Sequence, residues 1–283
     1  ATVSPGGKPS RYTTRDPIYD STTKTAGESG YYYRLPRLTD LCTRCGRVAR
    51  EFIPDGYYGV SVVSSDPEVV GNLELVASTW PSGEYQGYPC LKLNYEALKG
   101  GQATVTITHY YTFDAPYETG YCSYCNQYLA CPSNRNWYQE KDILTITVEP
   151  SAPTEDQVQE LLTDGAVTID CTNEEVSHAD KTYGLLAGGY TIGAVQGNST
   201  SGYTVEVSVT PAAYVAQYNT DQAATHTLAP TTQGAKSITL VYNKTAKAWQ
   251  VKAGTAPVKY TVVCETPAPS APTEDQVQEL LTD

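Results

Sequence analysis

Residues 203–209 read YTVEVSV, and the strict alternation of apolar and polar side chains in this stretch decides the fold. In an extended strand the four apolar residues point to one face and the three polar residues to the other. The stretch therefore predicts a β-strand with one buried side and one wet side.

Five further segments of the same half of the chain have this character and are separated by turn residues: Val167–Cys171, Tyr190–Ile192, Ser237–Tyr242, Ala248–Val251 and Val258–Cys264. Six such strands predict a β-sandwich. Cys171 and Cys264 fall on the inward faces of the first and last strands. We expect them to form a disulfide that stabilises the domain by roughly 4 kcal/mol, with two buried free thiols as the alternative.

A proline-rich segment precedes this half of the chain and recurs after it. Residues 150–164, PSAPTEDQVQELLTD, return letter for letter as residues 269–283, so we expect the chain to be cut from a repeat array. The predicted domains are a first domain at 1–149, a linker and short helix at 150–164, a second domain at 165–268, and the start of the next repeat at 269–283.

The linker should run into a short helix. Thr154 and Gln157 have the spacing of a capping box, and Gly165 stands where a left-handed residue can end a helix. A narrow apolar stripe is formed by Val158, Leu161 and Leu162. We expect this stripe to pack on its own domain and the segment to act as a spacer.

The second domain resembles a known kind of surface repeat. The likeness rests on YGLLAGGYTIGAV from Tyr183, YTVEVSVTPAAYVAQYN, THTLAP, SITLVYN and AWQV, which are similar to Ig-like repeats of large surface proteins of gut-dwelling Firmicutes. The resemblance implies an extracellular structural or adhesive module without a catalytic motif. Some surface proteins of such bacteria bind immunoglobulin variable domains, which the resemblance permits.

Two CxxC pairs dominate the first domain: Cys42 with Cys45, and Cys122 with Cys125. A tetrahedral zinc ion takes four soft ligands, and each pair presents two sulfurs. We predict a structural zinc site of these four cysteines, with Cys90 and Cys131 either bonded to each other or free. The alternative is an all-disulfide arrangement, because extracellular cysteines normally pair.

Between and after these pairs, the β pattern resembles the bacterial Ig-like group 2 domain. Its segments are Gly59–Val63, Ser64–Val70, Leu73–Ala77, Leu91–Leu93, Tyr95–Ile107 and Ile143–Val148. The best match is Tyr95–Ile107, in which Ala103, Val105 and Ile107 alternate as in a strand. The segment from about Thr108 to Lys141, with the second cysteine pair, departs from the family as an insertion.

This insertion is dense in aromatic residues, which we predict to bind a partner: Tyr110, Tyr111, Tyr117, Tyr121, Tyr124, Tyr128, Trp137 and Tyr138. The residues Tyr31, Tyr32 and Tyr33 lead into the first cysteine pair. A metal-stapled loop rich in Tyr resembles a paratope in its chemistry. The alternatives are a stapled loop that only covers a sheet edge, and Tyr selected by β-propensity on exposed sheet faces.

Charge and motifs argue against several classes of function. A net charge of −12 repels phosphate backbones and anionic lipid surfaces, and no apolar run approaches the length of a membrane span. The three histidines, His109, His178 and His226, are far apart, and no protease, esterase or phosphate-loop motif is present. Four thiolates would leave a zinc ion no open position for water. An intramolecular isopeptide bond would need a buried Lys beside a buried acid.

The sequence thus predicts an all-β, non-catalytic, extracellular protein of two tandem Ig-like β-sandwiches, attached to a bacterial surface or secreted. The first domain would bind a host protein or glycoprotein, including an immunoglobulin variable domain. One alternative is a purely structural stalk that presents another domain. Another is a set of accessory modules of a large secreted hydrolase.

Overall fold

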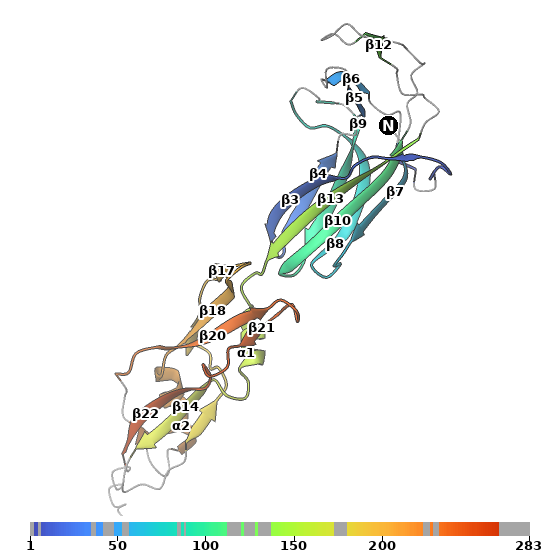
Figure 1. Ribbon diagram of the computed structural model, residues 1–283. Coiled ribbons are helices and arrows are strands. Elements are labelled where there is room, and N and C mark those ends of the chain that lie inside the picture. The colour runs from blue at the N-terminus through green and yellow to red at the C-terminus, as the bar shows by residue number, and fades with distance from the viewer. Residues whose placement is uncertain are drawn as a thin grey trace, which may run out of the picture. The chain divides into compact units, whose positions relative to one another are not determined.

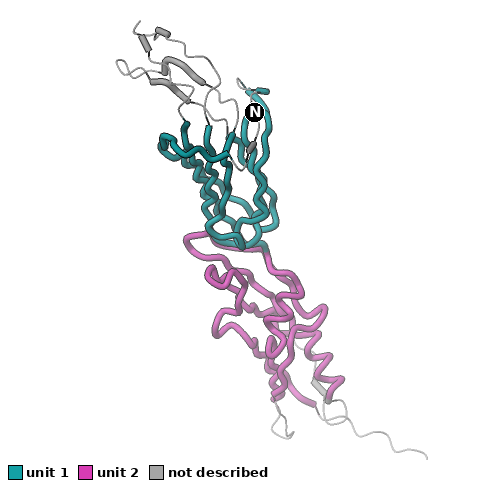
Figure 2. Tube along the Cα trace, turned by 90° about the vertical axis from the view of Figure 1, so that its right-hand side faces the viewer, with its two compact units in different colours: residues 1–151 teal, residues 152–283 magenta. Residues whose placement is uncertain are grey.

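The chain folds into two compact units, unit 1 (Ala1–Ser151) and unit 2 (Ala152–Asp283), shown in Figure 2. The computed structural model describes residues 3–4, 7–34, 38–41, 48–52, 57–83, 86–87, 89–111, 120–121, 128–129, 137–172, 180–222, 227–228 and 232–265. The boundary between the units falls in the predicted linker. The further repeat predicted at 269–283 lies outside the described residues.

Unit 1 is built from strands (Figure 1). These are β1 (Val3–Ser4), β2 (Thr13–Thr14), β3 (Ile18–Thr25), β4 (Ser29–Arg34), β5 (Leu38–Leu41), β6 (Val48–Phe52), β7 (Tyr57–Ser64), β8 (Val70–Thr79), β9 (Pro89–Ala97), β10 (Gly101–Tyr111), β11 (Gly120–Tyr121), β12 (Tyr128–Leu129) and β13 (Tyr138–Glu149). The larger sheet has the order β1-β7-β10-β13-β2, with β3 also on β13, and the smaller sheet has the order β4-β9-β8.

Alternation of side chains explains why these two sheets face each other. Ala103, Val105 and Ile107 of β10 are at most 1% exposed, as predicted, while the residues between them are partly exposed. They share one buried cluster with Leu93 of the smaller sheet and Ile146 of β13. Burial of apolar surface from both sheets in one cluster is the main term that holds the layers together.

One predicted strand of unit 1 is partly a turn. The segment Ser64–Val70 leaves the sheet, because Asp66 accepts hydrogen bonds from the backbone N–H groups of Val69 and Val70 at 3.1 and 3.0 Å. Pro67 lies inside this turn and has no N–H for a sheet. The next strand, β8, therefore begins only at Val70.

Unit 2 contains α1 (Glu155–Leu161), β14 (Val167–Thr172), β15 (Lys181–Tyr183), β16 (Tyr190–Ile192), β17 (Gln196–Asn198), β18 (Gly202–Val209), α2 (Ala212–Gln222), β19 (Thr227–Leu228), β20 (Lys236–Asn243), β21 (Ala248–Val251) and β22 (Val258–Glu265). One sheet has the order β15-β14-β22-β19 and the other β16-β18-β20-β21, with β17 on β18. All six strands predicted here are confirmed, and β15, β17 and β19 were not predicted. Across the described residues strands dominate and two helices occur, which confirms the all-β class.

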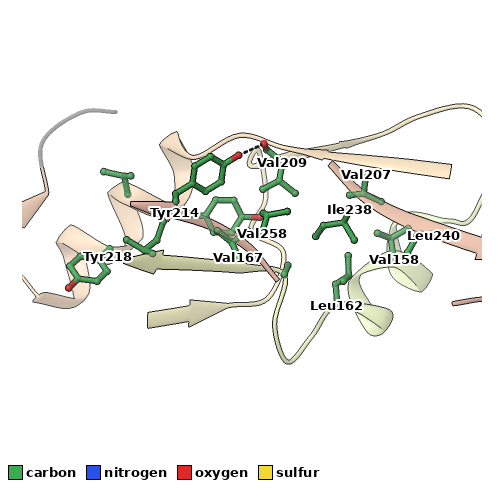
Figure 3. Packing of buried hydrophobic residues seen from close by; sticks show 14 of the residues in the cluster. Val158, Leu162, Val167, Val207, Val209, Tyr214, Tyr218, Ile238, Leu240 and Val258 are labelled. Carbon is green, nitrogen blue, oxygen red and sulfur yellow. Dashed lines mark hydrogen bonds between the residues drawn. The ribbon is translucent and has the colours of Figure 1, made fainter. Parts of the chain in front are cut away.

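The helix α1 begins as predicted but belongs to unit 2. Thr154 Oγ1 accepts from the Gln157 N–H at 3.3 Å, and Gln157 Oε1 accepts from the Thr154 N–H at 3.0 Å, which completes the capping box. Val158 and Leu162 are 0% and 2% exposed and pack in the core of unit 2, near Ile238 and Leu240 in Figure 3. Packing of the helix on its own domain is thus confirmed.

The end of α1 differs from the prediction. Leu162 caps the helix, with φ −118° and ψ 19°. Gly165 does not have a positive φ, so it is not a left-handed C-cap. At this end the Thr163 hydroxyl donates to the carbonyls of Gln159 and Glu160 at 2.8 and 3.1 Å, and β14 begins at Val167.

The helix α2 was missed by sequence reasoning. The helix starts just after Thr210-Pro211. Proline is common at a helix start, because the N–H groups of the first turn have no partner within the helix and the missing N–H of proline costs nothing there. Tyr214 and Tyr218, spaced one helical turn apart, are 0% and 1% exposed in the unit 2 core (Figure 3).

The first and last long strands pair in parallel in both units. In unit 1, β3 runs along β13 from the Ile18–Asp142 pair to the Thr25–Glu149 pair. In unit 2, β14 runs along β22 from Val167–Val258 to Thr172–Val263 (Figure 1). Each unit's chain therefore enters its sandwich at one end and leaves it at the other.

The predicted disulfide is confirmed. Cys171 and Cys264 are bonded, with Cα atoms 5.5 Å apart and a sequence separation of 93 residues. The bond joins the neighbouring strands β14 and β22 of one sheet. Within the described residues, no helix is both long enough and apolar enough to cross a membrane.

Candidate functional site

The two cysteine-bearing segments of unit 1 leave from the same end of its sandwich, which we call the hairpin end. The first segment follows Arg34 and returns at Tyr57, and the second follows Tyr111 and returns at Tyr138. Tyr111 is directly opposite Tyr138 in the sheet, and Tyr58 is opposite Tyr110. Sheet register therefore brings the bases of both segments together.

Each cysteine pair is flanked by two short strands that pair antiparallel. The strand β5 ends at Leu41 and β6 starts at Val48, and Leu38 pairs with Phe52. Around the second pair, Gly120 pairs with Leu129 and Tyr121 with Tyr128.

The predicted zinc ligands Cys42, Cys45, Cys122 and Cys125 themselves lie outside the described residues, so the zinc site stays a prediction. The flanking strands suit it chemically, because two hairpins that each carry Cys-x-x-Cys are a common way to offer four thiolates to one zinc ion. Among the described residues, no group of three or more His, Cys, Asp or Glu is placed to hold a metal ion.

Of the other two cysteines of unit 1, the structure describes Cys90 but not Cys131. Cys90, at the start of β9, is fully buried and forms no disulfide with another described residue, and burial raises the pKa of its thiol. Cys131 lies outside the described residues. Their pairing therefore stays a prediction.

A buried ionic cluster lies between the two sheets directly beneath the hairpin end. The Arg34 guanidinium of β4 reaches across to β13, with Nη2 2.6 Å from Glu140 Oε1 and Nε 3.0 Å from Asp142 Oδ2. The Tyr32 hydroxyl donates to Asp142 Oδ2 at 3.2 Å. Side chains of Glu140 and Asp142 are only 5% and 1% exposed, so these are interior ion pairs.

His109 extends the cluster toward the hairpin end. Its Nε2 lies 3.4 Å from Glu140 Oε2, and its ring lies 5.7 Å from the rings of both Tyr57 and Tyr111. His109 is fully buried on β10, the strand on which it was predicted. His178 and His226 lie outside the described residues.

The pKa values of the two carboxylates in this cluster are shifted in opposite directions. Burial alone would raise the pKa of Glu140, but the neighbouring His109 and Arg34 outweigh it and hold that pKa below its ordinary value. For Asp142 burial wins over the attraction of Arg34, so its pKa is raised. Because both carboxylates are buried and bind an arginine of the opposite sheet, the arrangement suits a tie between the two sheets.

The aromatic residues predicted to bind a partner are only partly on the surface. Tyr110 and Tyr111 are 4% and 0% exposed and cannot contact a partner directly, which corrects their predicted role. Tyr111 stacks on Tyr138 at 5.8 Å as part of the interior, and the Tyr110 hydroxyl accepts a hydrogen bond from buried Gln139 at 2.7 Å.

The remaining aromatic residues of the predicted binding surface differ in burial and in how far the structure describes them. Trp137 and Tyr138 are partly buried. Tyr121 lies in β11 and Tyr128 in β12, and the structure describes the backbone but not the side chains of these two residues. Tyr117 and Tyr124 lie outside the described residues.

A row of aromatic residues, of which Tyr31 is exposed and Tyr33 and Trp80 are half-buried, runs along the outer face of the smaller sheet. Tyr31 is 67% exposed, its ring lies 5.5 Å from that of Tyr33, and the Tyr33 ring lies 6.1 Å from that of Trp80. The Lys92 ammonium lies 5.5 Å from the ring centres of both tyrosines. These four residues form what we call the aromatic row. Along β4, Tyr31 and Tyr33 alternate with Tyr32 and Arg34, which turn inward, and this alternation is the sequence signal for the row.

A shallow polar groove continues from the row. It has a volume of about 380 Å³ and is lined on its outer side by Tyr31, Asn72, Glu74, Asn94 and Glu96. Two amide–carboxylate pairs cross it, with Asn72 donating to Glu96 at 2.5 Å and Asn94 donating to Glu74 at 3.2 Å. Aromatic faces thus adjoin hydrogen-bonding groups on one open surface.

An isopeptide bond finds no support in the described part of the chain. The lysines that contact acids there, such as Lys181 with Asp221 and Lys259 with Asp170, are 36% and 52% exposed. No described lysine is buried.

No protein-family model, no curated protein and no solved structure matches this chain. The candidate site is therefore interpreted from its own residues.

Proposed function

We propose that this protein is a non-catalytic, extracellular module of a bacterial surface array, and that unit 1 binds a host macromolecule. The observation that carries the proposal is the aromatic row of Tyr31, Tyr33, Lys92 and Trp80 beside the polar groove. Surface Tyr and Trp rings supply large contact areas at low entropic cost, and adjoining amides and carboxylates supply orientation.

Of the two predicted partner classes, the groove favours a glycoprotein over an immunoglobulin variable domain. Aromatic rings pack on the apolar faces of sugar rings, and the Asn and Glu side chains can exchange hydrogen bonds with sugar hydroxyls. A pocket of about 380 Å³ is small for a protein surface but suits one or two sugar rings.

The zinc ion belongs to the same proposal. Four thiolates at the hairpin end would fix the two hairpins to each other and so set the rim next to the aromatic row. The ion would be structural, because four protein ligands leave no open position.

The Ig-like class of both units is also part of this proposal. Two sheets that enclose one core in each unit, with short strands and turns, are what an Ig-like sandwich requires. The parallel pairing of terminal strands supports an array, since each unit receives the chain at one end and releases it at the other.

The binding claim is tested with the whole chain immobilised and exposed to serum or mucus glycoproteins. We expect retention of a glycoprotein, and we expect the triple variant Tyr31→Ala, Tyr33→Ala, Trp80→Ala to lose at least tenfold in affinity. The matched control is Tyr19→Ala, because Tyr19 is 72% exposed on the other sheet. Equal retention by all three proteins would show that the aromatic row is not the binding surface, and no retention by the native chain would favour the stalk alternative.

A further inference from the structure

The terminal strands of unit 2 are arranged so that tension along the chain loads them in shear. The chain enters β14 at Val167, beside Val258 at the start of β22, and it leaves β22 beyond Thr172, the last residue of β14. Pulling the two chain ends apart slides the strands along each other. Their ladder hydrogen bonds lie across the direction of pull, so several bonds must break together.

The disulfide lies at the far end of this strand pair. Cys171 is the fifth residue of β14, and Cys264 is near the end of β22. A pull on β14 therefore reaches Cys171, crosses the sulfur bridge to Cys264 and leaves the unit. The chain between the two cysteines, which includes α2 and both edges of the second sheet, lies outside this covalent path.

We propose that unit 2 is a force-bearing module in which the Cys171–Cys264 disulfide carries tension past the folded interior. The parallel strands β14 and β22 resist the pull through hydrogen bonds loaded in shear, and we call this pair the clamp. The disulfide, which still joins the strands if these bonds break, is called the lock. Under tension the chain between the two cysteines is not extended, because the load bypasses it through the disulfide. This goes beyond ligand binding and does not depend on it.

Unit 1 provides an internal comparison. Its terminal strands β3 and β13 also pair in parallel over eight residue pairs, but neither strand contains a cysteine. Unit 1 therefore has the same clamp without this lock. When its strands separate, its interior is directly exposed to the force.

Stretching the complete chain between its ends in a force spectrometer tests the proposal. Without reductant, only the residues before Cys171 can be pulled out, so we expect no release from unit 2 longer than roughly 70 Å. With a thiol reductant, we expect one added single-step release of about 300 Å, because the cysteines are 93 residues apart and an extended residue spans about 3.4 Å. A release of this length without reductant would overturn the lock, and release in several small steps would overturn the clamp.

Variants identify the source of the release. The double variant Cys171→Ala, Cys264→Ala should give the 300 Å step without reductant, whereas Cys90→Ala, which removes a buried thiol of unit 1, should leave unit 2 locked. If the double variant does not fold, the reduced native chain gives the same measurement. A double variant that stays locked would show that the disulfide does not carry the load.

Discussion

At the scale of single residues, the most informative feature is the ionic cluster of Arg34, Glu140, Asp142 and His109. Arg34 and Glu140 are 106 residues apart in the sequence but 2.6 Å apart in space. Breaking a buried ion pair is costly, because the remaining charge is left without its partner. The cluster therefore fixes the smaller sheet against the larger one just below the hairpin end.

Glu140→Gln should destabilise unit 1 in a pH-dependent way. The pKa of Glu140 is lowered by folding, so its stabilising effect is present above the ordinary pKa of about 4.3 and is lost as pH falls through the lowered value. We expect a cost of about 2–3 kcal/mol at neutral pH, which shrinks in acid. Urea unfolding between pH 3 and pH 7 measures it.

Asp142→Asn is the matched control, and its pH dependence should have the opposite sign. The pKa of Asp142 is raised by folding, so the native protein loses stability as pH rises through that pKa, and the variant does not. The stability of the variant relative to the native chain should therefore improve with rising pH. If the stability of both variants relative to the native chain changed with pH in the same direction, the assigned pKa shifts of Glu140 and Asp142 would be contradicted.

At the scale of elements, α1 shows how a helix predicted as a spacer becomes part of a domain. Its capping box and its packing on unit 2 followed from the sequence, since both depend on residues a few positions apart. Its depth of burial did not follow, because only the opposing strands supply the partners Ile238 and Leu240. The helix α2 was missed because its two tyrosines face a core that the local pattern does not contain.

Two neighbouring leucines of α1 test this integration. Leu162 is 2% exposed and Leu161 is 36% exposed. We expect Leu162→Ala to cost about 2–5 kcal/mol of unit 2 stability, through lost burial and the cavity left behind. Leu161→Ala should cost less than about 1 kcal/mol. Thermal unfolding of both variants measures the difference, and equal costs would mean that α1 is only a linker.

At the scale of the whole molecule, the two units should unfold separately and respond to different chemicals. The zinc proposal predicts that a strong chelator lowers only the unfolding temperature of unit 1. A thiol reductant should lower only that of unit 2, by removing the stabilisation of about 4 kcal/mol from its disulfide. Calorimetry of the complete chain under each condition separates the two transitions.

The all-disulfide alternative for unit 1 predicts a different result in this experiment. Reductant would then lower both transitions, and the chelator would change neither. The Cys171→Ala, Cys264→Ala variant serves as the control that assigns the transition of unit 2. These outcomes decide the state of Cys42, Cys45, Cys122 and Cys125.

The sequence by itself determined the alternating strands of unit 2, the start of α1 and the disulfide, because alternation, cap spacing and the side on which a cysteine lies are local properties of the chain. Only the tertiary structure decided which aromatic residues are exposed. Tyr110 and Tyr111 had the composition of a binding loop but are buried, whereas Tyr31 is open to solvent. Burial depends on what packs over a residue, and here the covering groups come from strands distant in the sequence. The same holds for Arg34, whose acidic partners only the pairing of two sheets could supply.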